Sequence, residues 1–200
     1  LENDLLKVKF ITDGTISSIY DKVNDRESVE SGESANSLTV YDDKGDAWDF
    51  QPDYNKRQIT HFELIASEPD IDGPLARMKQ TYRYGKSTLT QTVCLTEGSR
   101  RIDFQTHVDW KESGKMLRAL FPLAIRSMDA NCEIQFGHIK RPTHSNTKWD
   151  WAKYEVAVQK WIDISQPDYG FALLNDCKYG HKIKGNVISL NLLRSPKTPD

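Results

Sequence analysis

The chain has 200 residues, of which 38% are hydrophobic and 28% are charged, and its formal net charge is −2. This composition is typical of a folded, soluble domain and excludes an intrinsically disordered chain. The small net charge gives no reason to expect binding to nucleic acid or to an anionic membrane.

The three cysteines, Cys94, Cys132 and Cys177, are an odd number and have no paired spacing. Neither a zinc site nor a disulfide framework is indicated, and we expect buried, reduced thiols in a cytoplasmic protein. The chain has no signal peptide and no apolar run that could span a bilayer. It starts at Leu1 and stops after a polar tail, so we interpret residues 1–200 as one domain cut at both ends from a longer polypeptide.

Apolar and polar residues alternate with a period of two through the first third of the chain, which predicts β-strands. Asp13-Gly14 is a hairpin signal between two such stretches, at residues 8–10 and 16–20. Residues 25–36 are polar and predict a surface loop. Further strands are predicted at residues 38–41 and 58–66, with an acidic segment at residues 41–50 between them.

Three long strands are predicted next, at residues 75–84, 87–95 and 101–110, with turns at Gly85 and Gly98. The third of these strands has one largely apolar face, because apolar and polar residues alternate along it. That face consists of Ile102, Phe104, Thr106, Val108 and Trp110. The pattern predicts an antiparallel meander.

The remaining strands are predicted at residues 117–125, 130–136, 155–164, 170–175 and 187–193. Pro122 lies inside the first of them and cannot donate a backbone hydrogen bond, which favours an edge strand or a bulge. No window of about eleven residues shows the apolar stripe of an amphipathic helix. The sequence therefore predicts an all-β domain, a large antiparallel β-sandwich with long, strongly curved sheets.

Residues 136–155 are rich in polar and aromatic side chains, among them Arg141, His144, Asn146 and Asp150. Planar polar side chains bind vicinal hydroxyls, and flat rings cover the apolar C–H faces of a pyranose, so this mixture favours sugar binding. The alternative is that Asn146 and Asp150 cap turns while the two tryptophans of the block pack against the sandwich.

The acidic segment, residues 41–50, is a second candidate site. Trp48 could be a sugar platform with Asp49 accepting a hydrogen bond from a hydroxyl, or the four aspartates could hold a cation. The order of the oxygen ligands is not that of an EF-hand. An acidic surface loop is an equally good interpretation.

Two other polar segments are less favoured as sites. His107 and Asp109 have the His-X-Asp spacing of a zinc site, and both project from one face of a strand. The sequence supplies no third or fourth ligand nearby, so a solvated strand face is the better interpretation. Residues 175–180 are interpreted as a turn closed by Gly180, in preference to the rim of a cleft.

Ordered motifs run through most of the chain. They are residues 136–155, 159–163, 169–180 and 185–196, the Asp46-Ala-Trp-Asp49 segment, and Asp109-Trp110 before Leu120-Phe-Pro122. In this order they resemble the C-terminal β-region of glycoside hydrolase family 38, the α-mannosidases, and most of all the bacterial and cytosolic type. The resemblance implies a galactose-mutarotase-like supersandwich fold.

The resemblance also implies a retaining, zinc-dependent enzyme acting on α-mannosides. Its aspartate nucleophile and zinc ligands belong to a catalytic α/β domain, which is followed by a helical bundle and lies upstream of the matched region. We therefore assign no catalytic residue and no metal ligand to this chain, and we expect no cofactor in it. The upstream domains of the same polypeptide and an α-mannoside are the implied partners, and a homo-oligomer of the whole enzyme is left open.

We predict a non-catalytic region, inactive alone, that completes the substrate cleft and supports the catalytic domain. The predicted cleft residues are Arg141, His144, Asn146 and Asp150, followed by Trp48 and Asp49. In this prediction Asp150 orients Arg141 or His144. The alternatives are a free-standing carbohydrate-binding module and a purely structural domain, and the latter predicts a large exposed apolar patch on the isolated chain.

Overall fold

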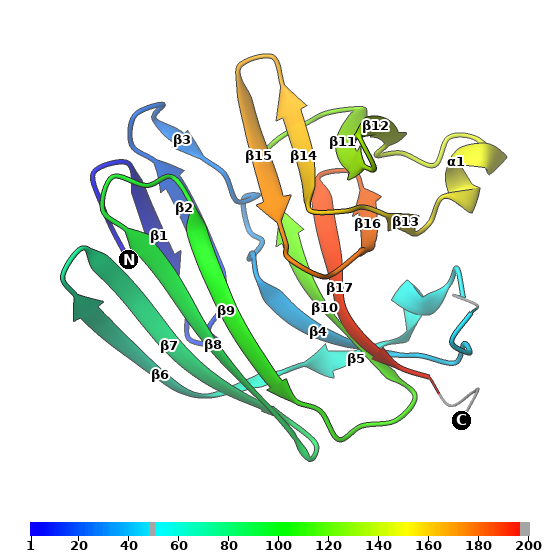
Figure 1. Ribbon diagram of the computed structural model, residues 1–200, viewed down its shortest axis with the longest axis horizontal. Helices are drawn as coiled ribbons and strands as arrows, with labels where there is room; N and C mark the ends of the chain where they lie inside the picture. The colour runs from blue at the N-terminus through cyan, green and yellow to red at the C-terminus, as the bar shows by residue number, and fades with distance from the viewer. Residues whose placement is uncertain (49–50, 197–200) are drawn as a thin grey trace.

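The computed structural model describes residues 1–48 and 51–196. In this part of the chain seventeen strands form four antiparallel sheets, and the only helices are one 3-10 turn and one short α-helix (Figure 1). The all-β class and the antiparallel pairing predicted from the sequence are confirmed. The strands are divided among four sheets, and their description as one supersandwich stays a prediction.

Two sheets form the left side of the molecule in Figure 1. The three-stranded sheet contains β1 (Leu6–Phe10), β2 (Ile16–Asp21) and β3 (Arg26–Glu27). The second, which we call the outer sheet, contains β6 (Glu63–Asp72), β7 (Leu75–Tyr84), β8 (Ser87–Thr96) and β9 (Ile102–Asp109), paired in that order. Strands β7 to β9 confirm the predicted meander.

Gly14 joins these two sheets. It has a φ of +86° in the turn between β1 and β2, where a Cβ atom would lie 2.5 Å from Tyr82 Oη. The Gly14 carbonyl accepts hydrogen bonds from Gln80 Nε2 at 2.9 Å and from Tyr82 Oη at 3.2 Å. Only glycine allows this conformation together with such a close approach. The predicted hairpin at Asp13-Gly14 is thus confirmed, and its turn is also the contact between the sheets.

A six-stranded sheet crosses the centre of the molecule. Its strands, in order, are β13 (Val156–Ala157), β16 (Gly180–Lys184), β17 (Val187–Ser195), β10 (Lys115–Pro122), β4 (Ser37–Asp42) and β5 (Gln58–His61). Strand β10 lies between β17 and β4, so the prediction of an edge strand at Pro122 is wrong. Pro122 is the last residue of β10, where its missing N–H interrupts no further pairing, and the alternative bulge occurs between Leu117 and Arg118.

The fourth sheet lies at the upper right of Figure 1. Its strands, in order, are β12 (Gly137–Pro142), β11 (Asp129–Ile134), β14 (Trp161–Gln166) and β15 (Tyr169–Leu174). Strand β12 occupies the first part of the polar block at residues 136–155, and the rest of the block leaves the sheet. Beyond it, helix α1 (Lys148–Ala152) and the 3-10 turn η1 (Tyr54–Arg57) lie together at the right end of the molecule.

One hydrophobic core joins all four sheets. Each sheet contributes residues that are no more than 3% exposed, such as Val8, Leu89, Leu117 and Ile162. Burying a side chain of this size stabilises a fold by about 1.5–3 kcal/mol. The predicted apolar face of β9 packs against this core through Ile102, Phe104 and Val108.

The cysteines are free in the structure. Cys94 and Cys132 are buried as expected, but Cys177 is exposed, because it lies in the turn after β15 instead of in a strand. No helix within residues 1–48 and 51–196 is long and apolar enough to cross a membrane.

Candidate functional site

The segment that follows β12 leaves the sheet at a fixed point. Thr143 is 4% exposed, and its Oγ1 donates to the Ser127 carbonyl at 2.6 Å while its N–H donates to the Met128 carbonyl at 3.0 Å. The Thr143 carbonyl accepts from the Gly185 N–H at 2.6 Å, in the turn between β16 and β17. We call residues 143–155 the polar loop, and Thr143 anchors its start to two sheets.

Helix α1 within the polar loop is built by a capping box. Asp150 Oδ2 accepts from the Thr147 hydroxyl at 2.7 Å and from the Thr147 N–H at 3.1 Å, and the Asp150 N–H donates to Thr147 Oγ1 at 3.1 Å. These bonds hold the pKa of the Asp150 carboxyl below its usual range. Asp150 is therefore ionised at neutral pH and acts as a hydrogen-bond acceptor. The turn-capping alternative considered from the sequence is realised for this residue.

His144 and Asp150 are brought together by the loop. His144 Nδ1 lies 3.5 Å from Asp150 Oδ2, and the two side chains are 30% and 15% exposed. Protonation of His144 would make this contact an ion pair, and the imidazole is a further cause of the lowered pKa of Asp150. The Asn146 N–H points to His144 Nδ1 at 3.4 Å, and Asn146 is exposed. Three of the predicted cleft residues thus lie along one loop.

Arg141 lies apart from these residues. It is on β12, opposite Ala130 of β11, and its guanidinium lies beside the Cys132 thiol. Burial raises the pKa of the Cys132 thiol to about 11, and Arg141 opposes this rise. Arg141 Nε is buried without a hydrogen-bond partner. Within residues 1–48 and 51–196 Arg141 forms no ion pair, so the contact predicted for Asp150 is made to His144 alone.

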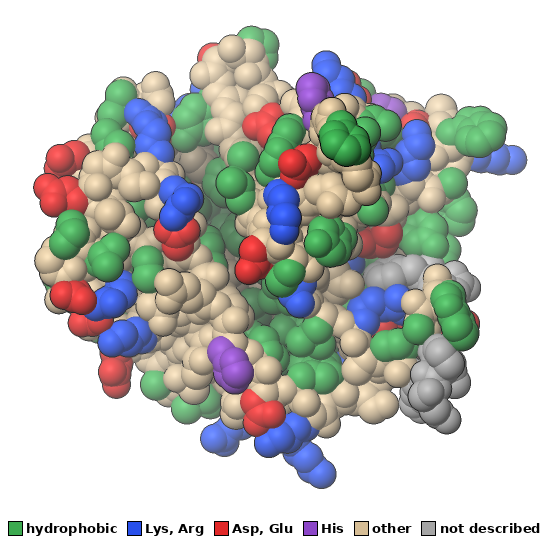
Figure 2. Space-filling view, viewed as in Figure 1, with side chains coloured by type: hydrophobic (Ala, Val, Ile, Leu, Met, Phe, Trp, Pro, Cys, Tyr) green, Lys and Arg blue, Asp and Glu red, His purple; other side chains and the backbone are tan. Residues whose placement is uncertain are grey.

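Three tryptophans at this end of the molecule are exposed, two of them in the polar loop. Trp149 and Trp151 on α1 are 80% and 58% exposed, and Trp48 is 80% exposed. The Trp151 ring centroid lies 6.3 Å from that of Tyr154. Hydrophobic side chains over α1 are visible at the upper right of Figure 2. The alternative in which Trp149 and Trp151 pack against the sandwich is therefore wrong, and the rings are open to a ligand or a partner.

Trp48 belongs to a second segment at this end, residues 43–48 and 51–57, which we call the acidic loop. Arg194 holds it, since its Nε and Nη2 donate to the Asp43 carboxylate at 2.7 and 2.9 Å. The Trp48 N–H donates to Asp46 Oδ1 at 2.8 Å, the local turn expected of an aspartate in a loop. Asp49, the other predicted residue, lies outside the described residues.

A buried charged cluster lies beneath both loops, and it was not predicted from the sequence. Arg118 of β10 is 0% exposed, and its Nη1 lies 3.1 Å from Oε1 of Glu155, the last residue of the polar loop. Tyr54 Oη, from the acidic loop, donates to the same oxygen at 2.6 Å. Arg118 Cζ and Lys182 Nζ lie 5.1 and 4.6 Å from the centroid of the Tyr54 ring. The available signal was a single arginine inside an apolar strand.

Burial dominates the electrostatics of this cluster. It raises the pKa of the Glu155 carboxyl and of the Tyr54 hydroxyl, and it lowers the pKa of Lys182. The neighbouring His181 is 0% exposed, and burial lowers its pKa to about 4. Each of these shifts disfavours the charged form, as expected for groups removed from water. Arg118 opposes the shift of Glu155 because its positive charge favours the carboxylate.

A cavity of about 1330 Å³ lies elsewhere, between β9 and β15, and Figure 2 shows the hollow. Its lining includes the rings of Phe104, Phe121 and Phe171. None of the predicted cleft residues that the structure describes lines it. The polar loop and this cavity are therefore separate features of the surface.

The structure also shows the surroundings of the two polar segments that were less favoured as sites, His107–Asp109 and residues 175–180. His107 and Asp109 are exposed on β9, and Asp109 pairs with Lys111 at 2.8 Å, which confirms a solvated strand face. Asn175 Oδ1 accepts from the Lys178 N–H at 2.6 Å, as expected for a turn. Residues 175–178 also line the cavity between β9 and β15, so the less favoured interpretation, the rim of a cleft, describes this segment as well. In the described part of the chain no three His, Cys, Asp or Glu side chains are grouped so that they could hold a metal ion. These residues therefore do not fit the zinc ion that the family resemblance implies for a whole enzyme.

The side chains at this end are suited to binding. A retaining glycosidase needs two carboxyl groups about 5 Å apart on either side of the bond to be cleaved. Of the two acids in the polar loop, Asp150 is held by Thr147 and Glu155 is buried against Arg118. The exposed Asn146 amide and the tryptophan rings can instead contact the hydroxyls and the C–H faces of a sugar.

A family model described as the glycosyl hydrolases family 38 C-terminal domain matches residues 1–200. Alpha-mannosidase 2C1 of Mus musculus is 41% identical over 209 residues, an alignment that covers 100% of this chain and 20% of the mouse protein. Alpha-mannosidase G of Dictyostelium discoideum is 40% identical over 210 residues, covering 100% of this chain and 19% of that protein. The chain therefore spans about a fifth of the length of these curated relatives.

A solved structure shows the same fold. The crystal structure of an alpha-mannosidase from Enterococcus faecalis V583 matches with a TM-score of 0.83 at 15% sequence identity. The match covers 98% of this chain and 25% of that one. The arrangement of strands described above is thus also found as part of a much longer chain.

Proposed function

The chain belongs to glycosyl hydrolase family 38 as its C-terminal domain, and we propose that it is the non-catalytic C-terminal region of a retaining, zinc-dependent α-mannosidase. In this proposal the region completes the substrate cleft and supports the catalytic domain. Its partners are the upstream catalytic α/β domain and helical bundle of the same polypeptide, and the whole enzyme acts in the cytoplasm. The four sheets together are then one galactose-mutarotase-like supersandwich.

The observation that carries this proposal is the exposed surface at the right end of the molecule. There the polar loop presents His144, Asn146 and Asp150 beside the rings of Trp149 and Trp151. Loops that bind ligands are typically held on a rigid scaffold, and Thr143 and the capping box hold this one. The membership of family 38 supplies the class of ligand, an α-mannoside.

The contribution of this region to the reaction is the positioning of substrate. Asn146 binds a hydroxyl, Asp150 orients the His144 imidazole, and the tryptophan rings cover an apolar face of a sugar and exclude water from it. Arg141, which is packed on the β11–β12 hairpin, orders the root of the loop. Holding a substrate in the reactive geometry can lower a barrier by about 7–11 kcal/mol in favourable cases. The nucleophile and the zinc ligands are left to the upstream domain.

A free-standing carbohydrate-binding module is the second candidate, because the three exposed tryptophans could bind a sugar. The same exposed rings are also expected for the purely structural domain, whose apolar patch would be covered by a neighbouring domain. Such a module would bind mannosides with the surface described above but would have no catalytic partner. The lengths of the relatives support the first candidate, because the matched region is a fifth of each of them.

Mannoside hydrolysis tests the proposal. With zinc added, we compare hydrolysis of an aryl α-mannoside by this chain and by the longer polypeptide that carries it. Activity in the longer polypeptide alone is expected. Activity in the 200-residue chain would overturn the non-catalytic assignment, and inactivity of both, with mannoside binding by the chain, would favour the module.

A further inference from the structure

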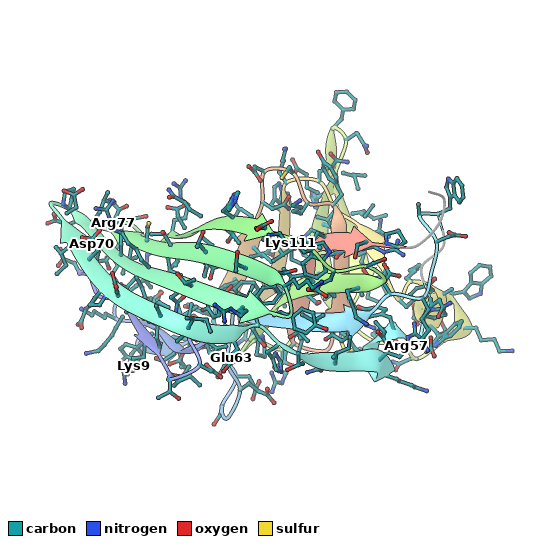
Figure 3. The ribbon with its side chains drawn as sticks, turned by 90° about the horizontal axis from the view of Figure 1, so that it is seen from below. Lys9, Arg57, Glu63, Asp70, Arg77 and Lys111 are labelled. Atoms are coloured by element: carbon teal, nitrogen blue, oxygen red, sulfur yellow. The ribbon has the colours of Figure 1, made fainter. Side chains whose placement is uncertain are left out.

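The acidic loop and the polar loop meet at a hydrogen bond between Tyr54 and Glu155, although about one hundred residues separate them in sequence. Figure 1 shows η1 and α1 at the same end of the molecule, and Figure 3 shows this end from below with Arg57 of η1 labelled. Each loop carries exposed tryptophan, Trp48 on one and Trp149 and Trp151 on the other. A ligand could contact both loops only if their relative position is fixed.

A single carboxylate oxygen connects the two loops. Glu155 Oε1, at the end of the polar loop, accepts from Tyr54 Oη of the acidic loop at 2.6 Å and lies 3.1 Å from Arg118 Nη1. Arg118 is fixed in turn, since its Nε donates to Ser189 Oγ at 2.7 Å and its Nη2 to the Ser189 carbonyl at 2.9 Å. The chain of contacts therefore runs from both loops to β10 and β17 at the centre of the six-stranded sheet.

Stability alone does not explain this cluster, because burying its charged groups costs free energy. Placing a carboxylate and a guanidinium in the interior incurs a desolvation cost that their attraction often only balances. A well-packed apolar pair would stabilise the fold at least as well. An ionic group has one advantage, because its hydrogen bonds are directional and allow one arrangement of the loops where apolar contacts would allow several.

We propose that Arg118, Glu155 and Tyr54 are positioning residues, which fix the acidic loop and the polar loop relative to each other so that Trp48, Trp149 and Trp151 form one ligand-facing surface. The coupling of the loops is a property of this chain. Its consequence for turnover rests on the proposed function. Lys182, over the Tyr54 ring, completes the packing around the shared carboxylate.

The coupling can be tested by measuring a distance between the loops with double electron–electron resonance. Spin labels are attached to Ala47→Cys and Ser145→Cys, both at exposed positions, in a Cys177→Ser background that removes the exposed native thiol. A reference pair, Lys9→Cys and Glu63→Cys, reports on the sheets at the other side of the molecule, where Figure 3 labels both residues.

Two substitutions then break the shared contact. Glu155→Gln removes the charge and keeps the shape, and Tyr54→Phe removes one hydroxyl and keeps the ring under Lys182 and Arg118. Each should broaden the distance distribution between the loops and leave that of the reference pair unchanged. A distribution that stays narrow in both variants would overturn the inference. Tyr54→Phe retains every charge, so the distance measurement can still be made on this variant if the Glu155→Gln variant does not fold.

Kinetics of the longer polypeptide separate this inference from the proposed function. Small displacements of groups that position a substrate lower kcat/KM by roughly tenfold to a hundredfold. Tyr54→Phe should therefore lower kcat/KM for an aryl α-mannoside by about tenfold at temperatures well below its Tm, where the variant is still folded. A purely structural role would lower the Tm and leave the kcat/KM of the folded enzyme unchanged. Broadened distances with wild-type kinetics would support the coupling of the loops and contradict the proposed cleft.

Discussion

The two ends of the molecule use charged residues in different ways. At the left end of the outer sheet, Asp70 lies 3.0 Å from both Arg77 Nε and Lys79 Nζ, on the surface shown in Figure 3. At the right end, Arg118 and Glu155 form a pair in the interior. The first kind of pair costs little, and charged side chains on an exposed edge strand such as β6 generally disfavour pairing with other chains. The second kind is costly, and its effect is to define the geometry of two loops.

The largest effect should follow from breaking the buried pair. Arg118→Met leaves Glu155 buried without its partner and should lower the free energy of unfolding by about 3–5 kcal/mol. Urea denaturation followed by tryptophan fluorescence measures this change. The double variant Arg118→Met with Glu155→Leu should recover most of the loss, because both members of the buried ion pair are then removed together. A single variant as stable as the wild type would show that the pair is solvated.

The next effect should appear as a pH dependence of stability at the same end. Burial lowers the pKa of His181 from 6.5 to about 4, so the unfolded chain binds a proton between these values while the folded chain does not. The part of the unfolding free energy that depends on neutral His181 is fully present above pH 6.5 and is lost as the pH falls towards about 4. The loss should be on the order of 3 kcal/mol.

Urea denaturation of the wild type and of His181→Leu at several pH values between 7 and 4 measures this dependence. The wild type should lose stability relative to the variant as the pH falls. Parallel curves for the two proteins would mean that His181 is accessible to protons in the folded state.

A smaller effect should come from the cap of α1. Thr147→Ala removes a hydroxyl that donates to the Asp150 carboxylate and accepts from the Asp150 N–H. The substitution should lower the free energy of unfolding by about 1 kcal/mol. The pKa of Asp150 should rise at the same time, because the Thr147 hydroxyl is the largest cause of its depression. A carbon-detected NMR titration of the carboxyl measures this pKa, and an unshifted value would contradict the capping geometry.

The smallest effect should come from the surface pair at the left end. Lys79 is 54% exposed, and Lys79→Met removes the same charge as Arg118→Met from a solvated position. The urea midpoint should stay close to that of the wild type. If Lys79→Met lowered the free energy of unfolding as much as Arg118→Met, the exposed and the buried ion pairs would not differ in their contribution to stability.

Much of the fold could be predicted from the sequence, because alternation and turn residues are local signals. The strands at residues 75–84 and 187–193 and the turn at Gly14 are clear examples. Strand β16 was missed because its alternation is short and has little apolar character: Lys182 and Lys184 alternate with a histidine and one aliphatic residue, Ile183, and the strand is held by pairing on both sides. Helix α1 has five residues and is too short to show an apolar stripe.

The candidate site was only partly predictable, because some of its contacts join residues that are distant in sequence. His144, Asn146 and Asp150 lie within seven residues of one another, so their proximity is visible in the sequence. The separation of Arg141 from them depends on the pairing of β12 with β11, which turns its side chain towards Cys132. The cluster of Arg118, Tyr54 and Glu155 unites three distant segments. No local sequence pattern predicts such a contact, although an arginine in an apolar strand indicates that a buried partner exists.

The most direct test of the account is the turnover of the longer polypeptide with Asn146→Ala. Asn146 is exposed and Ser145, its equally exposed neighbour, provides the control Ser145→Ala. If the polar loop completes the substrate cleft, Asn146→Ala should lower kcat/KM for an α-mannoside by about tenfold or more without changing Tm, and Ser145→Ala should not. Asp150→Ala should lower turnover as well, together with the loss of the helix cap. Wild-type kinetics in both Asn146→Ala and Asp150→Ala would contradict the assignment of this loop to the cleft.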